Sequence, residues 1–132
     1  MVYLVKVTNL TTGILVVSQF VETVEEANAI VDDPQYVGPM FRREVISIND
    51  MAVFIKSLKK SLKAAAERKY QSNIEEKYTI AEIASLTALQ AEKANKFTNM
   101  KTYILPFYDA MIAKKQEIDA CTTYEQLMAI VI

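Results

Sequence analysis

The segment MFRREVISINDMAVFIKSLKKSL, residues 40–62, contains the point where a strand pattern gives way to a helix pattern. Residues 40–48 combine β-branched and aromatic side chains, which predicts a strand. From Asn49 or Asp50, either of which can cap a helix, apolar residues recur every three or four positions to about Tyr70. These apolar positions are Met51, Phe54, Ile55, Leu58, Leu62 and Ala65. We therefore expect a strand that leads into a long helix without a flexible linker.

Residues 1–48 are predicted to form a small α/β head with the order β-β-α-β. Residues 2–8 and 14–20 are rich in β-branched and aromatic residues, and the turn-like NLTTG between them predicts a hairpin. Thr23, with Glu26 three positions later, predicts a capping box at the start of a helix. The DDP sequence that follows is expected to end this helix.

Residues 49–132 are predicted to be a helical region of three to four helices that continues directly from the head. A break is expected in QSNIEEKY, after Tyr70. Thr79 with Glu82 predicts a second capping box, which opens a helix to about Phe97. We therefore expect an α+β fold in which the β-β-α-β head precedes a mainly α-helical C-terminal part.

The last third of the chain carries the strongest helical stripe. Its members are Met100, Tyr103, Ile104, Phe107, Tyr108, Met111 and Ile112. The TNM sequence around residue 99 is expected to break or kink the chain, and Pro106 is expected to kink the helix or to lie near its start. Thr122 with Glu125 predicts a third capping box, which opens a last short helix.

The composition argues against several classes of catalytic and metal chemistry. The sequence has no His and a single Cys, Cys121, which removes His-based triads, His metal ligands and Cys-rich zinc sites. Its two glycines stand apart, so there is no Gly-rich phosphate loop. Paired carboxylates such as Asp32 and Asp33 are better explained as helix terminators than as converging metal ligands. We expect a protein that is not an enzyme and has no cofactor or metal site.

Charge is distributed unevenly along a chain whose formal net charge is −1. Residues 1–50 contain three basic and seven acidic groups, whereas residues 51–70 contain six basic groups and one Glu. A turn of about 100° per residue groups four lysines on the side away from the apolar stripe, namely Lys56, Lys59, Lys60 and Lys63. This basic helix, residues 54–70, has four possible roles: a solvated face, a docking surface for acidic protein, a phosphate contact with nucleic acid, or a membrane contact.

Two apolar features are candidates for protein interfaces. The aromatic side chains of the last long helix form either internal core or a contact surface. The segment LMAIVI, residues 127–132, is apolar throughout, so we expect it to pack on the protein's own core or on a neighbouring chain. The interface candidates beside the four lysines are Tyr103, Phe107 and Tyr108 in the stripe and Leu127, Met128 and Ile130 in the tail.

No segment predicts export or membrane insertion. The N-terminal MVYLVKVTNL lacks a basic region followed by a long apolar one. No apolar run reaches the roughly 18 residues that a membrane-spanning helix needs. A single Cys cannot form an internal disulfide, so nothing indicates an oxidising compartment. We expect a cytoplasmic protein, or a component of a particle assembled in a cytoplasm.

Two stretches resemble small bacteriophage tail and virion accessory proteins. The first is YILPFYDAMIAKKQEIDACTTYEQLMAI, residues 103–130, with a charged helix, a Thr-Thr turn and a short helix. The second is YLVKVTNLTTGILVVSQFVETVEEANAI, residues 3–30. The resemblance implies a virion component assembled in host cytoplasm, and it assigns a role to no individual residue.

These observations favour a non-enzymatic structural or assembly protein that acts through protein–protein interfaces. Its expected partners are further copies of the chain, as a homo-oligomer, or other structural proteins of an assembly. The alternative is a small cytoplasmic binding module or regulator that contacts nucleic acid through the basic helix, residues 54–70.

Overall fold

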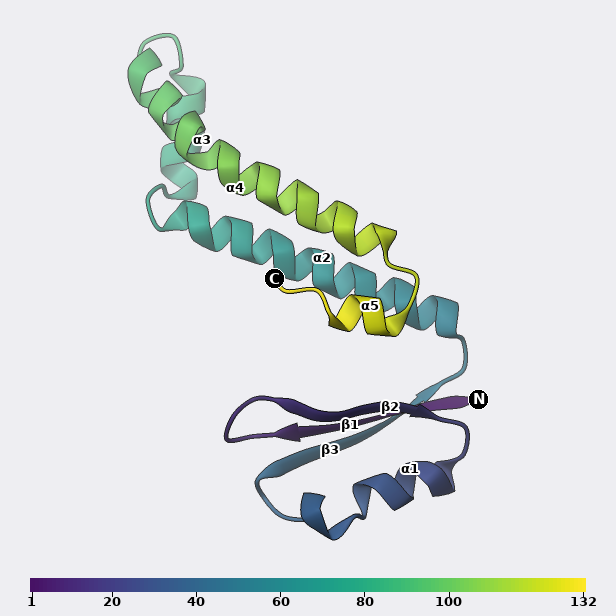
Figure 1. Cartoon of the computed structure of the whole chain (residues 1–132). Helices are drawn as coiled ribbons and strands as arrows, with labels where there is room; N and C mark the ends of the chain where they lie inside the picture. Colours follow the sequence, from purple (N-terminus) through teal and green to yellow (C-terminus); the bar gives the residue numbers. More distant parts are fainter. The chain divides into compact units, whose positions relative to one another are not determined.

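The computed structural model describes all 132 residues, Met1–Ile132. A three-stranded antiparallel sheet is followed by a mainly helical part, which confirms the predicted α+β fold class (Figure 1). The chain divides into two compact units, Met1–Phe54 and Ile55–Ile132. Each unit has its own cluster of buried apolar side chains.

The sheet of the first unit has its first strand in the middle. β1 (Val2–Asn9) pairs antiparallel with both β2 (Leu15–Val21) and β3 (Phe41–Ile48). The tight turn of the hairpin begins at Asn9, whose side-chain oxygen accepts a hydrogen bond from the Thr11 amide at 2.9 Å. The turn ends at Gly13, where φ is +71°, a conformation that glycine adopts without steric cost. The predicted hairpin is therefore confirmed.

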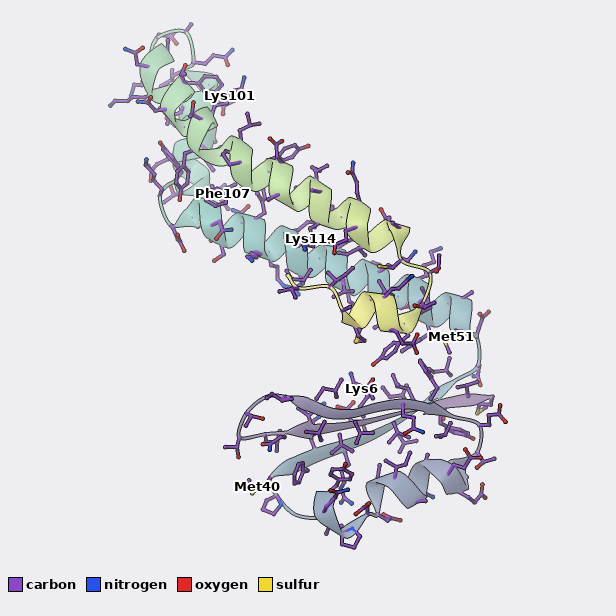
Figure 2. The ribbon with its side chains drawn as sticks, viewed as in Figure 1. Lys6, Met40, Met51, Lys101, Phe107 and Lys114 are labelled. Atoms are coloured by element: carbon purple, nitrogen blue, oxygen red, sulfur yellow. The ribbon has the colours of Figure 1, made fainter.

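One face of the sheet packs on α1 (Val24–Val31). The buried cluster between sheet and helix contains Val5, Val21 and Ala27, with Tyr3, Ile30 and Val31 packed against it. Arg43 donates a hydrogen bond to the main-chain oxygen of Val31 at 2.7 Å, which ties the end of α1 to β3. Lys6 projects from the opposite face of the sheet (Figure 2).

The ends of α1 follow from local signals in the sequence. The Thr23 hydroxyl accepts a hydrogen bond from the Glu26 amide at 3.1 Å, as in the first half of the predicted capping box. The helix ends at Val31, as the DDP sequence predicts, and Pro34 then opens a short 3-10 helix, η1 (Pro34–Tyr36).

The second unit is built from four helices. α2 (Met51–Glu75) begins just before the division between the units, and α3 (Ile80–Ala88), α4 (Ala94–Ala120) and α5 (Tyr124–Met128) follow. α2 and α4 lie side by side in opposite directions, and α5 returns beside α2 (Figure 1). A buried cluster joins these three helices and the tail: Ile118, Cys121 and Leu127, with Ile55, Leu58, Leu62, Ile130 and Ile132 packed against them.

A break does begin within QSNIEEKY as predicted, but α2 ends at Glu75 and not near Tyr70. The extra residues contain neither Gly nor Pro, and Ile74 among them is buried. Burial of Ile74 extends the apolar face of α2 by one turn beyond Ala66 and Tyr70, at intervals of four residues. Burial of Ile74 thus keeps residues 71–75 helical although their composition is mostly polar.

The helix predicted from Thr79 to about Phe97 is two helices. Its start is correct, since Thr79 accepts from the Glu82 amide at 3.1 Å and the Glu82 carboxylate accepts from the Thr79 amide at 3.4 Å. However, Leu89 leaves the helical conformation at φ −107° and ψ 25°. The turn that follows reverses the chain so that α4 can pack antiparallel to α2, a tertiary requirement that the Ala-rich local sequence does not encode.

Two further predicted boundaries are absent. The chain does not break at TNM, around residue 99, and no helix begins near Pro106. α4 is one helix from Ala94 to Ala120 that runs through both. Met100 is buried on the inner side, which anchors this part of the helix. Pro106 lies on an exposed side, where the carbonyl of Thr102 that loses its helical partner can be solvated.

The third capping box is present but is shifted by one residue from the prediction of Thr122 with Glu125. The Thr123 hydroxyl accepts from the Gln126 amide at 3.2 Å, and the Gln126 side chain accepts from the Thr123 amide at 3.3 Å. This frame directs both Tyr124 and Leu127 to buried positions. The requirement to bury an apolar pair therefore selects between two adjacent threonines.

Candidate functional site

Two of the four lysines grouped on α2 contact the end of α4. Lys59 donates a hydrogen bond to the main-chain oxygen of Asp119 at 3.1 Å, and Lys63 forms an ion pair of 2.9 Å with the Asp119 carboxylate. Asp119 belongs to the last turn of α4, where unpaired carbonyl groups and the negative end of the helix dipole favour a cation. These two lysines therefore have an intramolecular structural role.

Two further contacts connect α2 to the C-terminal tail and to α4. Lys69 donates a hydrogen bond to the main-chain oxygen of Ile132, so the tail is held against α2. Lys115 on α4 pairs with Glu67 on α2. The hydrogen bond and charge of Lys115, with a smaller contribution from Lys63, hold the pKa of Glu67 below its usual value of 4.5 against the opposing effect of desolvation.

Lys56 and Lys60 are the two predicted lysines that remain available. They lie four positions apart on α2, are exposed, and form no ion pair. The four lysines that the sequence groups together are therefore divided into an engaged pair and a free pair.

The predicted aromatic stripe is mostly internal. Tyr103 and Phe107 are partly buried, and their ring centroids are 5.3 Å apart in an edge-to-face arrangement. The Tyr103 hydroxyl donates to the main-chain oxygen of Asn73 at 3.1 Å, and Phe107 points toward α2 (Figure 2). Lys77 lies 4.9 Å from the centroid of the Tyr103 ring, within cation–π range.

Tyr108 occupies a different side of α4. Its side chain is 45% exposed, and its ring meets that of Tyr70 with centroids 6.0 Å apart. Burial, followed by the neighbouring Tyr108 phenol, raises the pKa of Tyr70 above its usual value of 10.0. Leu105, three positions before Tyr108, is 48% exposed, and Ile112, four positions after it, is half-buried. We call Leu105, Tyr108 and Ile112 the α4 flank, because their spacing places them on one side of the helix.

The tail residues are also divided. Leu127 is 1% exposed and Ile130 packs against the same buried cluster, so both belong to the core of this unit. Met128 is 39% exposed. Of the three tail candidates, Met128 alone has an exposed side chain.

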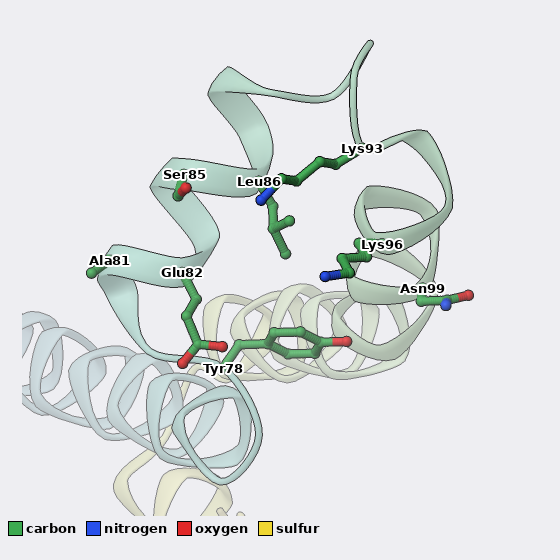
Figure 3. Close-up of a pocket in the computed structure, with 8 residues that line it drawn as sticks. All are labelled: Tyr78, Ala81, Glu82, Ser85, Leu86, Lys93, Lys96 and Asn99. Atoms are coloured by element: carbon green, nitrogen blue, oxygen red, sulfur yellow. The ribbon is translucent and has the colours of Figure 1, made fainter.

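A cavity that the sequence did not indicate lies between α3 and α4. Its volume is about 480 Å³, and it is lined by Tyr78, Ala81, Glu82, Ser85, Leu86, Lys93, Lys96 and Asn99 (Figure 3). Lys93 precedes the first residue of α4 and Lys96 lies in its first turn. The available signal was the pair of lysines three positions apart in EKANK, but nothing in the local pattern placed them opposite α3.

The remaining candidate groups do not converge on a metal-type site. No group of three or more His, Cys, Asp or Glu side chains comes together in the structure. Cys121 is buried, and its thiol donates to the main-chain oxygen of Glu117 at 3.3 Å. Cys121 therefore packs as a small apolar residue at the end of α4.

Comparisons of the chain with protein-family models, with curated proteins and with solved structures gave no match. None of the helices in the structure combines the length and the apolar character that crossing a bilayer requires.

Proposed function

We propose that this chain is a non-enzymatic structural or assembly protein that acts through protein–protein contacts, as a tail, neck or head accessory component of a bacteriophage virion. The observation that carries the proposal is the α4 flank, where two large side chains on one side of a long helix, Leu105 and Tyr108, are 48% and 45% exposed. Adjacent apolar side chains of this kind favour burial against another protein. The resemblance of residues 103–130 to virion accessory proteins supports the biological setting.

The flank is suited to a second copy of the chain. Tyr108 brings a large ring with a polar hydroxyl, the type of side chain that is enriched in interfaces. Tyr70 steadies that ring from α2, so little side-chain freedom remains to be lost on contact. The Tyr108 ring is thus held in place before any contact with a partner.

Sedimentation velocity of the full chain over a range of concentrations tests this proposal. We expect a mass that rises with concentration, and we expect the double variant Leu105→Gln, Tyr108→Gln to associate more weakly by about tenfold or more. Ile80→Gln is a matched control, because Ile80 is also apolar and exposed but lies on α3. A wild-type chain that stays monomeric at every concentration, or a control variant that weakens association equally, would contradict the proposal.

The second candidate is a small cytoplasmic module that contacts nucleic acid through the basic helix, residues 54–70. Lys56 and Lys60 favour it, since they are exposed and free on one side of α2. Such phosphate contacts are independent of sequence and weaken as salt increases. Titration of a generic DNA duplex at low and high salt distinguishes this candidate, and an absence of binding at low salt refutes it.

A further inference from the structure

The cavity between α3 and α4 has the dimensions of a small-molecule site. Its volume of about 480 Å³ lies within the range of roughly 300–1,000 Å³ that is usual for ligand pockets. One wall comes from α3, with Glu82, Ser85 and Leu86, and the other comes from the start of α4. Tyr78, just before α3, closes the lower end in the view of Figure 3.

The wall from α4 presents two positive charges to this space. The side chains of Lys93 and Lys96 reach from the α4 side toward α3 (Figure 3). Neither forms an ion pair or a side-chain hydrogen bond, although most other lysines of the unit do or lie over an aromatic ring. These other lysines are Lys59, Lys63, Lys69, Lys77, Lys114 and Lys115. Two positive charges that lie close together repel each other, and an anion between them relieves this repulsion.

The single acidic group in the cavity is already engaged. The Glu82 carboxylate accepts hydrogen bonds from both the amide and the hydroxyl of Thr79, at 3.4 and 3.1 Å. These bonds hold it at the start of α3, toward the Tyr78 end of the cavity (Figure 3). The cavity is therefore lined by two positive charges and one negative charge, and its positive charges lie at the end away from the Glu82 carboxylate.

Part of the lining between the charged groups is apolar. Leu86 projects from α3 toward the two lysines, and the ring of Tyr78 lies below it (Figure 3). An inorganic anion would use the lysines but would leave this surface in contact with water. A ligand with an apolar body attached to its charged group satisfies both parts of the cavity.

We propose that the cavity between α3 and α4 binds a small phosphate monoester with an apolar body. Two ammonium groups match a phosphate monoester better than a carboxylate, because the former carries about −1.5 to −2 charges at neutral pH. In this arrangement Lys93 and Lys96 bind the phosphate oxygens, while the organic group lies on Leu86 and the ring of Tyr78. The site belongs to α3 and α4 alone and does not depend on assembly through the α4 flank.

Titration of the isotopically labelled full chain with phenyl phosphate at low ionic strength, followed by amide NMR, tests the proposal. We expect saturable shifts for residues that line the cavity. Inorganic phosphate should bind more weakly by about tenfold, because it leaves the apolar surface uncovered. The double variant Lys93→Gln, Lys96→Gln should weaken phenyl phosphate binding by about tenfold or more, because it removes two charge-assisted contacts.

Lys56→Gln, Lys60→Gln is the matched control, since it removes the same charge from two exposed, unpaired lysines on another helix. We expect this control to bind within about twofold of the wild type, as expected for substitutions outside the site. An absence of saturable shifts at the cavity, an equal loss in both double variants, or equal binding of inorganic phosphate would each overturn the proposal. All four substituted lysines are exposed, so both variants should fold, and an unchanged melting temperature verifies this.

Discussion

Lys63 and Asp119 lie 56 positions apart in the chain, and their side chains meet at 2.9 Å. The pair connects the middle of α2 to the last turn of α4, where Lys59 also binds the main-chain oxygen of Asp119. Two of the four lysines grouped on α2, Lys59 and Lys63, thus form contacts within the chain. The surface available to a polyanion on this helix is smaller than the charge count alone indicates.

Asp119→Asn should lower the free energy of unfolding only slightly. Both side chains of the Lys63 pair are partly exposed, so solvent screens their attraction, and we expect a loss of about 0.5 kcal/mol. The bond from Lys59 goes to the main chain and should survive the substitution. A double-mutant cycle with Lys63→Met, measured by urea unfolding at low and high salt, isolates the pair. A coupling energy that does not decrease with salt would contradict an electrostatic interaction.

Leu127→Ala should be strongly destabilising, unlike the same change at its neighbour. Leu127 is fully buried against Ile118 and the apolar face of α2, so its truncation should cost about 2–5 kcal/mol of unfolding free energy. Met128 is partly exposed, and Met128→Ala should cost about 0.5 kcal/mol or less. Urea unfolding of both variants measures the difference. Similar losses in the two variants would contradict the arrangement in which Leu127 is buried and Met128 is exposed.

The head could be predicted closely because its signals are local. The DDP sequence ends α1, Gly13 permits the turn, and the strand segments are rich in β-branched and aromatic residues. The boundaries in the helical part depend on contacts between distant segments. Ile74 and Met100 lie in segments whose local composition predicts a break in the helix. Both segments are helical in the structure, because each of these side chains is buried in the folded unit. Such contacts override weak helix propensities.

The candidate sites show the same limit. Grouping the lysines on α2 follows from helix periodicity, but the partner of Lys63 comes from a segment that the pattern does not connect to it. In the sequence, Lys93 and Lys96 are two charges in a polar segment and form no recognisable pattern. They line a cavity only because the chain reverses after Leu89 and places α3 opposite them.

The capping residue of α5 can be identified by comparing two adjacent threonines. Thr123→Ala removes the hydroxyl that accepts from the Gln126 amide, and we expect a loss of about 1 kcal/mol in unfolding free energy. Thr122→Ala removes a hydroxyl that only donates to the Gln126 side chain at 3.2 Å, so its cost should be smaller. Thermal unfolding of both variants checks the order. A larger loss for Thr122→Ala than for Thr123→Ala would mean that Thr122, and not Thr123, caps α5.

The pairing of Glu67 with Lys115 should make stability depend on acidity. The pKa of Glu67 is lowered in the folded chain, chiefly by the hydrogen bond and charge of Lys115, so the unfolded chain binds this proton more readily. The contribution is therefore complete above the usual pKa of 4.5 and is lost as the pH falls through the lower folded value. Glu67→Gln cannot titrate and should remove this part of the acid sensitivity.

Urea unfolding from neutral pH to well below pH 4.5 provides the measurement for Glu67. The wild type should lose more stability than Glu67→Gln across the acid range, and the two curves should converge at the lowest pH, where the carboxyl of the wild type is protonated as well. Glu76→Gln is a matched control, because Glu76 lies just after the same helix and forms no ion pair. If Glu67→Gln and Glu76→Gln follow the same acid dependence, the contact between α2 and α4 through Lys115 contributes nothing specific to stability.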